Sequence, residues 1–407
     1  MPGSERPRFD IPLTRTIRVP DPYRVERWER IPELGPRILF FSGGTALKRT
    51  SRRLKRYTHN SAHLITPFDS GGSSAELRQR FAMPSIGDLR NRLVALADES
   101  IQGNPEIYEL FSHRLSAEGS TAELRAGLDR LVEGTDPLVA SLPGSFGRIV
   151  RTHLRSFRNH LSDSDTGFRG PFDLRGASIG NLLLTAGYLD NERDLDSAIF
   201  LLAKLLHVNG QVQLVSDVNL QLLATLEDGS EVEGQHLLGR SGGTLGRRIE
   251  SVRLVSSGES SSEASAPLTE KSRRAIAAAE LICYPMGSLF SSVIAPLLAD
   301  GIPEALESSG APKIFVPNTG VDPEQYGHSP SDAVDRLLNA LGRSLEDPGG
   351  VLDLVLLDSS DSSYELPPDR DRIRNSRLEL IELPLVDGGS EPRITAERLV
   401  EVLLSLA

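Results

Sequence analysis

The stretch Ile38-Leu39-Phe40-Phe41-Ser42-Gly43-Gly44-Thr45 decides the fold class. Four consecutive apolar residues are typical of a strand that is buried on both faces, as in a parallel sheet. The glycines that follow predict a tight turn, and Leu47 and Leu54 lie on one side of the helix expected next. A second strand over residues 62–66 leads to a similar turn at residues 71–74. Strand, glycine turn, helix and strand in this order indicate an α/β fold.

The same alternation returns in the C-terminal part of the chain. Apolar strands are expected over residues 281–284, 313–316, 352–357 and 378–385, and a helix over about 395–406. We therefore expect a Rossmann-like, mostly parallel sheet flanked by helices, formed by a single domain over residues 37–407.

Two segments interrupt this sheet. Leucines that recur at i, i+4 and i+7 predict a mostly helical insertion over about residues 89–207. Residues 211–256 change to an alternating pattern with the turn Asp228-Gly229, which predicts a small antiparallel hairpin. The serine-rich stretch 256–266 has no periodicity and is predicted to be a flexible loop.

Length, composition and charge exclude several classes of protein. The chain has 407 residues, 39% of them hydrophobic, so it can bury a large core and disorder throughout is ruled out. Lys and Arg number 45 against 56 Asp and Glu, and the net charge of −11 argues against general nucleic-acid binding. The single cysteine, Cys283, allows no internal disulfide and argues against a cysteine-built zinc site, which suits a cytoplasmic location.

The N-terminus differs from the rest of the chain. Seven prolines within residues 1–36 disfavour a long helix, so we predict an arm that lies on the body, with short extended pieces such as residues 16–19. No segment approaches the ~18 apolar residues that a membrane span needs, so no membrane partner is expected.

Three strand ends carry glycine together with hydroxyl residues. These turns contain Gly43, Gly44 and Thr45; Gly71, Gly72, Ser73 and Ser74; and Gly287 and Ser288. Glycine lets backbone amides approach an anion, a following helix N-terminus adds positive partial charge, and parallel strands bring their carboxyl ends to one edge. A phosphate cradle is therefore predicted, although one glycine turn alone is as often structural. The GxGxxG and P-loop patterns are absent, which argues against dinucleotide binding and against an ordinary kinase or NTPase.

Charged and amide side chains near these turns suggest further roles. Asp69 and Asp88 could hold a hydrated Mg²⁺ that neutralises substrate phosphates, and Asp88 could equally cap its helix. Arg78 and Arg90 could clamp phosphate or act as structural partners of the carboxylates. Asn181 could cap a helix or contact a ligand.

Six of the nine residues in 48–56 are cationic and lie at helical spacing on the face opposite Leu47 and Leu54. We interpret them chiefly as a solvated helix face. Nucleic-acid binding is the less favoured alternative because the chain is acidic overall.

Six ordered blocks of sequence then point to a known family. They are FSGGTALKRTSRRLKRYT, ITPFDSGGSSAELR, IGDLRNRLVALAD, RGASIGNLLLTA, AAAELICYPMGSLFSSVIAPLL and KIFVPN, spread over roughly residues 37–320. In these blocks the chain resembles the family of 2-phospho-L-lactate transferases (CofD-like) and gluconeogenesis factors (YvcK-like). The blocks GGSSAELR and GDLRNRLVAL look closer to the gluconeogenesis-factor branch.

The resemblance implies a nucleotide diphosphate bound at the carboxyl edge of the sheet. The gluconeogenesis-factor branch is associated with UDP-sugar binding and with regulation of carbon metabolism and cell-wall growth. The transferase branch uses Mg²⁺ to move a phospholactyl group from a nucleotide-diphosphate donor onto a hydroxyl. A regulatory binding protein is thus the first hypothesis, a Mg²⁺-dependent transferase the second, and an interaction protein that has lost its ligand the third. A homodimer is kept among the candidate assemblies.

Site roles carry over only to positions that match. The resemblance assigns ligand binding to Gly43, Gly44, Thr45, Asn181, Gly287, Ser288 and Asn318. It assigns metal binding to Asp69 and Asp88.

Several positions depart from the family pattern. Ala46 replaces a usual glycine, Ser70 replaces the second aspartate of DDGGSS, and Ala177 replaces a usual histidine. Pro285-Met286 replaces a usual Gly-Pro, and Phe290 replaces a usual tyrosine. These changes cluster in the site and imply a divergent member.

Overall fold

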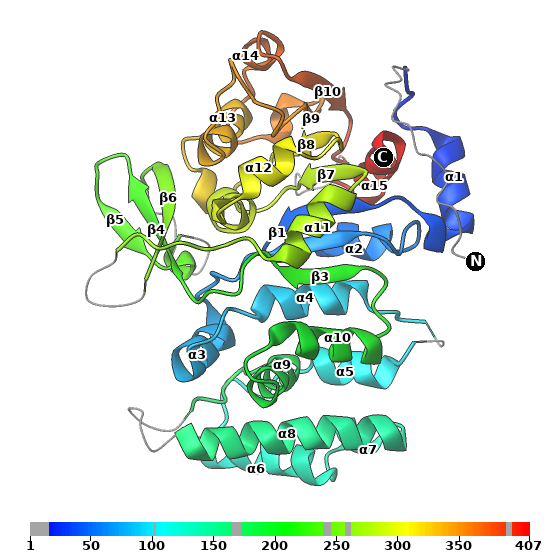
Figure 1. Ribbon diagram of the computed structural model, residues 1–407, viewed down its shortest axis with the longest axis vertical. Coiled ribbons are helices and arrows are strands. Elements are labelled where there is room, and N and C mark those ends of the chain that lie inside the picture. Colours follow the sequence, from blue (N-terminus) through cyan, green and yellow to red (C-terminus); the bar gives the residue numbers. More distant parts are fainter. Residues whose placement is uncertain (1–15, 101–102, 165–171, 239–245, 257–261, 388–392) are drawn as a thin grey trace, which may run out of the picture.

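The computed structural model describes residues 16–100, 103–164, 172–238, 246–256, 262–387 and 393–407. Its centre is a seven-stranded, fully parallel sheet with the order β10-β9-β8-β7-β1-β2-β3 (Figure 1). The strands are β1 (Ile38–Ser42), β2 (Ala62–Ile65), β3 (Gln211–Leu214), β7 (Leu281–Tyr284), β8 (Lys313–Phe315), β9 (Leu354–Asp358) and β10 (Glu379–Leu383). The predicted Rossmann-like parallel sheet is confirmed.

Strand β1 explains why both faces of the sheet are covered. All five of its residues are buried. Ile38 and Phe40 belong to a core cluster with residues of α2 and α15, whereas Leu39 and Phe41 pack in a second cluster with residues of α12 and α13. The alternation of side chains along a strand thus requires an apolar run, as the sequence indicated.

The helices have the following bounds. They are α1 (Pro22–Arg30), α2 (Lys48–Leu54), α3 (Gly72–Phe81), α4 (Gly87–Leu96), α5 (Pro105–Ser112), α6 (Thr121–Glu133), α7 (Pro137–Ala140), α8 (Gly144–Ser164), α9 (Ile179–Asp190), α10 (Leu195–Leu205), α11 (Glu270–Ala278), α12 (Ile302–Glu307), α13 (Pro330–Ala340), α14 (Arg370–Arg374) and α15 (Ala396–Leu406).

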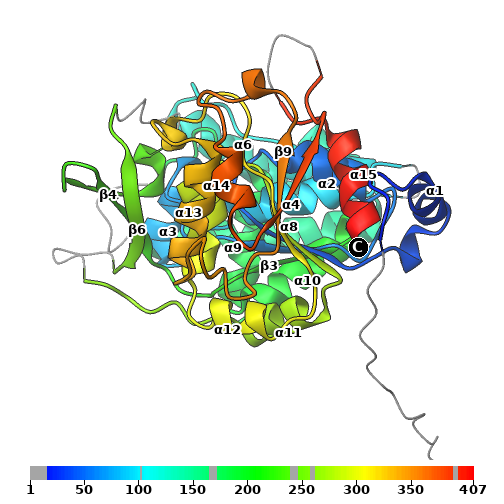
Figure 2. The same cartoon turned by 90° about the horizontal axis from the view of Figure 1, so that it is seen from above.

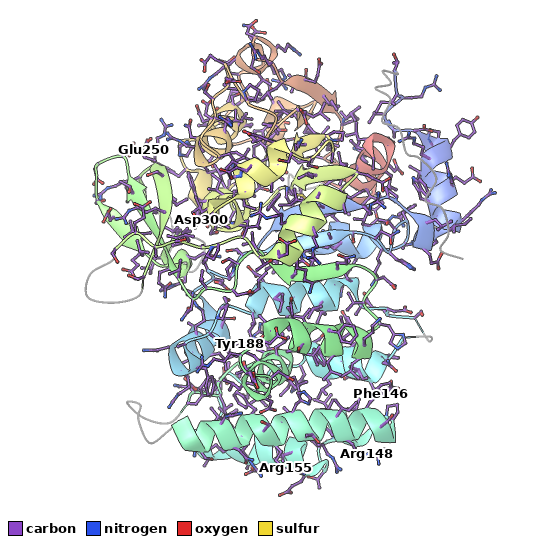
Figure 3. All side chains as sticks on the ribbon, viewed as in Figure 1. Phe146, Arg148, Arg155, Tyr188, Glu250 and Asp300 are labelled. Atoms are coloured by element: carbon purple, nitrogen blue, oxygen red, sulfur yellow. The ribbon has the colours of Figure 1, made fainter. Side chains whose placement is uncertain are left out.

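The predicted helical insertion is confirmed by helices α4 to α10. In Figure 1 they stack beyond the β3 edge of the sheet, with α6 and α8 farthest from it. Helix α8 buries Val150, Leu154 and Phe157, and it exposes Arg148 and Arg155 to solvent (Figure 3). An amphipathic helix of this kind forms because one apolar stripe faces the core.

The antiparallel part is a separate three-stranded sheet with the order β5-β4-β6. Its strands are β4 (Gln221–Leu226), β5 (Glu231–Glu233) and β6 (Ile249–Val255), and Asp228-Gly229 lies in the β4–β5 turn. The hairpin predicted within residues 211–256 is therefore present, but the first strand of that range, β3, belongs to the main sheet instead. Residues 257–261 of the predicted serine-rich loop lie outside the described residues.

Part of the N-terminal arm forms a helix that the prolines did not lead us to expect. Asp21 accepts hydrogen bonds from the amides of Tyr23 and Arg24, and Pro22 occupies the first helical position, so α1 is well started. Helix α1 lies beside α15 (Figures 1 and 2), where the guanidinium of Arg24 donates to the carbonyl of Ser405 at 3.1 Å. Residues 16–19, expected to be extended, form no strand.

Among the described residues, no helix has the length and apolar character needed to cross a lipid bilayer.

Candidate functional site

The topology of the main sheet places a crevice between β1 and β7. Strands β2 and β3 follow β1 on one side, and the chain then crosses to β7 on the other side. In such sheets ligands bind at the carboxyl ends of the two strands where the direction of winding changes. A cleft of about 640 Å³ lies there, which we call the central cleft. Its lining includes residues 44–46 after β1, 286–288 after β7, part of the loop 318–324 after β8, and Gln235 and His236 next to the small sheet.

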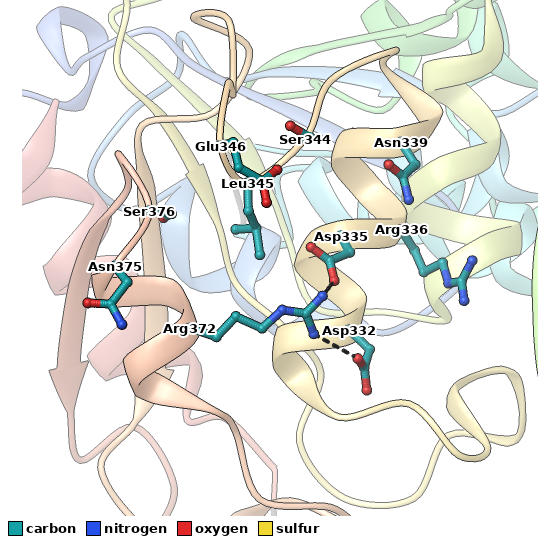
Figure 4. Close-up of a pocket in the computed structure, with 10 residues that line it drawn as sticks. All are labelled: Asp332, Asp335, Arg336, Asn339, Ser344, Leu345, Glu346, Arg372, Asn375 and Ser376. Atoms are coloured by element: carbon teal, nitrogen blue, oxygen red, sulfur yellow. Dashed lines mark hydrogen bonds and ion pairs between the residues drawn. The ribbon is translucent and has the colours of Figure 1, made fainter.

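A second groove, of about 670 Å³, is not the candidate site. It lies between α13 and α14, away from the strand ends (Figure 4). Its charged side chains bind one another, since Arg372 forms ion pairs with Asp332 at 3.1 Å and with Asp335. Arg336 is likewise paired with Glu250 at 2.6 Å. Ion pairs of this kind hold the two helices together, and they leave few charged groups available to bind a ligand.

The turn after β1 contributes Gly44 and Thr45 to the central cleft. Gly44 has a φ of +58°, a left-handed conformation that favours glycine, and its amide donates to the carboxylate of Asp88 at 2.7 Å. Gly43 lies behind the turn, where a Cβ would come within 2.8 Å of the Thr66 side chain. The glycine pair therefore serves close packing as well as turn geometry.

The turn after β2 contributes Asp69 and Gly71. The Gly71 amide donates to Asp69 at 3.0 Å. The predicted residues Gly72, Ser73 and Ser74 begin α3 and are not among the residues that line the cleft.

Asn181 also lies outside the lining. It is buried, and its side-chain amide donates to the hydroxyl of Ser73 at 3.2 Å. The hydroxyl of Ser74 lies close enough to Gly87 that a Cβ there would be 2.4 Å away. These residues hold α3, α4 and α9 together behind the site, and the N-cap of α9 is Ser178.

The turn after β7 contributes Gly287 and Ser288 and faces the first turn. A Cβ built on Gly287 would lie 3.8 Å from the Cβ of Ala46. Within the described part of the chain, the amides of Thr45, Ala46, Gly287 and Ser288 donate no hydrogen bond to another protein group. Unpaired amides at two facing turns are the donors that an anion requires.

Two carboxylates from the loop after β8, Asp322 and Glu324, bind the start of the helical segment that follows the third turn. Glu324 accepts hydrogen bonds from the amides of Phe290 and Ser291 at 3.0 and 2.8 Å, and from the Ser291 hydroxyl. Asp322 accepts from the amide of Leu289 at 3.3 Å. The first amides of η3 (Leu289–Ile294) are thus bound internally, so the predicted cradle is confined at this turn to Gly287 and Ser288.

Burial gives the carboxylates of the site raised pKa values. Burial, and then the charge of Asp88, raises the pKa of Asp69 to about 7. Burial also raises the pKa of Asp88, against the opposing effect of the Gly44 amide and of Arg92. The pKa of Glu324 is raised to about 7 by burial and by Asp322.

Asp69 and Asp88 differ in their access to the cleft. Asp69 lines it, whereas Asp88 lies behind the first turn and does not. The prediction that Asp88 caps its own helix is wrong, because Ile86 is the N-cap of α4 and no side chain caps it. Within the described ranges, no cluster of three or more His, Cys, Asp or Glu side chains could hold a metal ion.

Arg78 and Arg90, the two arginines considered as phosphate clamps, do not line the central cleft. Arg78 is a structural residue: it donates to the side chain of Asn219 and to the carbonyls of Phe68, Asp69 and Leu220. Arg90 is buried, does not line the cleft, and has Asn181 as a partner at 3.4 Å. Burial lowers the pKa of both guanidinium groups to about 10.

Sequence reasoning missed several residues of the cleft. Ser291, Ser292, Asp322 and Glu324 follow predicted strand ends within a few residues, so a wider reading of those loops could have found them. No sequence pattern indicated Gln235 and His236 as site residues. They do not follow a strand of the main sheet, and it is the fold of the small sheet that brings them to the cleft. The ring of His236 hydrogen-bonds the hydroxyl of Ser70 at 2.9 Å. Ser70, which departs from the family pattern, thus links the part of the cleft wall formed by Gln235 and His236 to the turn after β2.

Met286 and Phe290, the two bulky departures from the family pattern, do not fill the cleft. Met286 is one of its lining residues, and Phe290 packs in the core against His328. Asn318, predicted from the strand before it, lines the cleft.

Comparisons with known proteins agree with this architecture. A family described as 2-phospho-L-lactate transferase CofD matches residues 38–386. A putative gluconeogenesis factor from Nostoc sp. is 31% identical over 309 residues, which is 76% of this chain and 53% of that protein, so the match spans about half of its length. The gluconeogenesis factor of Bacillus subtilis is 28% identical over 332 residues, 81% of each chain.

Solved structures give the same fold. A crystal structure of a protein from Bacillus halodurans has a TM-score of 0.66 and 23% identity, and the match covers 91% of this chain and 99% of that one. At this identity the likeness concerns the fold alone.

Proposed function

Since the chain belongs to the 2-phospho-L-lactate transferase CofD family, we propose that it binds a nucleotide diphosphate of the UDP-sugar type in the central cleft. In this proposal it acts as a regulatory binding protein in carbon or cell-wall metabolism. The relatives reported above are named gluconeogenesis factors, which supports a regulator. The volume of about 640 Å³ suits a small-molecule ligand.

One observation carries the proposal. The amides of Thr45, Ala46, Gly287 and Ser288 stand at two facing turns without protein partners in the described residues. A diphosphate placed between the turns would accept hydrogen bonds from both. Such bonds to a charged acceptor are stronger than those between neutral groups.

Asp69 and Asp88 are the proposed ligands of Mg²⁺. Asp69 fits such an ion because it lines the cleft, and Asp88, one oxygen of which accepts the Gly44 amide, is the nearby buried carboxylate whose charge raises the pKa of Asp69. Mg²⁺ is commonly held by one or two carboxylates together with substrate phosphates. When bound, the ion would supply positive charge that neutralises the diphosphate.

Transferase activity is the second candidate, and the retained pair Asp69 and Asp88 favours it. An acceptor hydroxyl oxygen would attack the phosphorus that carries the acid, and the nucleoside monophosphate would leave with the bonding electrons. The amides of both turns would hold the charge that develops on the phosphate oxygens. Glu324 lines the cleft and, with a pKa of about 7, is suited to take the hydroxyl proton.

A thermal-shift panel separates these functions. UDP-glucose, UDP-N-acetylglucosamine, GDP and GTP would each be added with and without Mg²⁺, to the native chain and to Asp69→Asn. A rise in Tm with a UDP-sugar that needs neither Mg²⁺ nor Asp69 supports the regulator. A rise that needs both supports the transferase, which an assay for release of nucleoside monophosphate would then test. If no nucleotide changes the Tm, nucleotide binding is contradicted and the interaction protein remains.

A further inference from the structure

The basic segment 48–56 lines a groove of its own. This groove, of about 600 Å³, lies between α2 and the start of α15. Four arginines of the segment line it, together with one from the chain before α15: Arg49, Arg52, Arg53, Arg56 and Arg393. We call it the arginine groove. Two carboxylates, Asp387 and Glu397, also line it, so its formal charge is positive in a chain whose net charge is −11.

The groove adjoins the central cleft. Arg49, Arg393 and Ile394 line both cavities. The position of the basic segment beside the central cleft therefore favours a binding role over that of a solvated helix face.

The arginine groups have hydrogen-bonding capacity that the protein leaves unused. The side chain of Arg49 has no ion pair or hydrogen bond within the part of the chain that the structure describes. Arg52 and Arg53 are partly engaged: Arg52 is ion-paired with Glu99 at 3.5 Å and Arg53 donates to the Tyr57 hydroxyl at 2.6 Å, although neither Nε atom has a hydrogen-bond partner among those residues. The guanidinium of Arg49, which lines both cavities, is therefore the group most available to an anion.

Carboxylates in and around the groove offset only part of its charge: Arg52 is paired with Glu99 at 3.5 Å and Arg56 with Glu29 at 3.4 Å, both from outside the groove. Asp387 is bound to Arg398 at 2.7 Å and accepts from the Thr395 hydroxyl at 3.2 Å. Among the described residues, Glu397 has a single long ion-pair contact, with Arg53 at 4.0 Å.

We propose that the arginine groove binds a small anionic ligand that carries at least two phosphate or carboxylate groups. Guanidinium groups bind both kinds of group with paired hydrogen bonds. A small ligand is favoured over nucleic acid because three of the five arginines lie on one two-turn helix and all five line a cavity of about 600 Å³. This site does not depend on nucleotide binding in the central cleft.

The test uses the full chain and titration calorimetry with inorganic tripolyphosphate, in the absence of Mg²⁺. The native chain should bind, Arg56→Gln should bind more weakly, and Arg53→Gln/Arg56→Gln should lose at least about tenfold in affinity. Lys48→Gln is the matched control, because it removes one charge from the same helix outside the groove, and it should stay within about twofold. A citrate titration in parallel shows whether carboxylates suffice in place of phosphates.

The outcomes that overturn the proposal are distinct from failure of nucleotide binding. Equal affinity in the native chain and the double variant removes the site. Loss of tripolyphosphate binding in Gly44→Ala but not in the double variant would place the anion in the central cleft and also overturn it. Tighter binding of a 20-nucleotide single strand than of tripolyphosphate would identify a nucleic-acid surface instead. Because Arg53 also contacts Tyr57, a double variant with an altered circular dichroism spectrum would be replaced by Arg56→Glu, which is exposed.

Discussion

The amide of Gly44 donates a hydrogen bond of 2.7 Å to the carboxylate of Asp88, a residue of helix α4 that lies 44 residues later in the chain. This bond fixes the left-handed turn after β1, and so it fixes the direction in which the next two amides point. Asp88 acts from behind the turn, where Arg92 lies near enough to lower its pKa against the effect of burial. The geometry of the proposed phosphate site thus rests on a buried residue that does not line the cleft.

Replacing Asp88 should therefore destabilise the protein. Asp88→Ala leaves the Gly44 amide without an acceptor, and the free energy of unfolding should fall by about 1–3 kcal/mol in urea denaturation. Asp88→Asn keeps an acceptor oxygen and should lose less. Asp371→Ala, at a side chain that is 89% exposed, is the control and should change stability by less than about 0.5 kcal/mol. Equal losses in Asp88→Ala and the control would contradict this role.

A pair of glycine variants separates backbone strain from ligand binding. Gly44 and Gly72 have φ angles of +58° and +54°, so alanine at either position should cost about 1–2 kcal/mol. A Cβ at Gly44 would also lie 3.1 Å from the Ser292 hydroxyl, whereas a Cβ at Gly72 would meet nothing within 4 Å. Gly44→Ala should weaken UDP-glucose binding in calorimetry, and Gly72→Ala should leave it unchanged. Equal effects of both variants on affinity would show that the first turn has no special part in binding.

The stability of the protein should depend on pH through Glu324. Its pKa is raised from 4.5 to about 7 in the folded chain, so between these values the folded state holds one proton more than the unfolded state. Its contribution to stability is therefore full below about pH 4.5 and is lost as the pH rises to about 7, at about 1.4 kcal/mol per pH unit.

Glu324→Gln cannot titrate and should show a flatter profile over this range. Urea denaturation at several pH values measures the difference between the two chains, which cancels the parallel contribution of Asp69, whose pKa is raised in the same direction. Profiles with the same slope would mean that Glu324 stays ionised in the folded protein.

The contact between Ser70 and His236 should hold the wall that the small sheet provides. The Ser70 hydroxyl bonds the His236 ring at 2.9 Å and accepts from the His236 amide at 3.3 Å. Ser70→Ala should lower stability by about 0.5–1.5 kcal/mol and weaken UDP-glucose binding, as measured by denaturation and calorimetry. Ser362→Ala is the control, because it removes an exposed hydroxyl that hydrogen-bonds the hydroxyl of Ser360 at 2.8 Å. An unchanged affinity in Ser70→Ala would separate this wall from the ligand.

The elements of the main sheet could be predicted from local sequence, and the reason is visible in β1. Its residues are apolar on both sides because helices cover both faces, so the buried strand left a continuous signal. The range 211–256 was predicted as one hairpin region, and its first strand, β3, could not be separated from it, because Gln211 and Gln213 alternate with apolar residues as in a hairpin strand. The prolines of the arm gave no sign of helix α1, because Pro22 occupies its first position and Pro20 and Pro32 lie outside it.

The candidate site was predictable only in part. Gly44, Thr45, Asp69, Gly71, Gly287, Ser288 and Asn318 line the central cleft, as their places at strand ends indicated. Gly43, Gly72, Ser73, Ser74, Asn181 and Asp88 do not line it. Position after a strand indicates which edge of the sheet a residue occupies, but not whether its side chain points toward the ligand or toward a neighbouring helix.

The sequence by itself determined the strands, the glycine turns and the edge at which they meet, because these follow from interactions between near neighbours. Only the tertiary structure decided which backbone amides remain available. The Gly44 amide is bound by Asp88 and the Ser291 amide by Glu324, 33 residues later, whereas the amides of Ala46 and Gly287 have no protein partner among the described residues. Hydrogen bonds between distant segments form only when folding brings them together, and no local pattern records them.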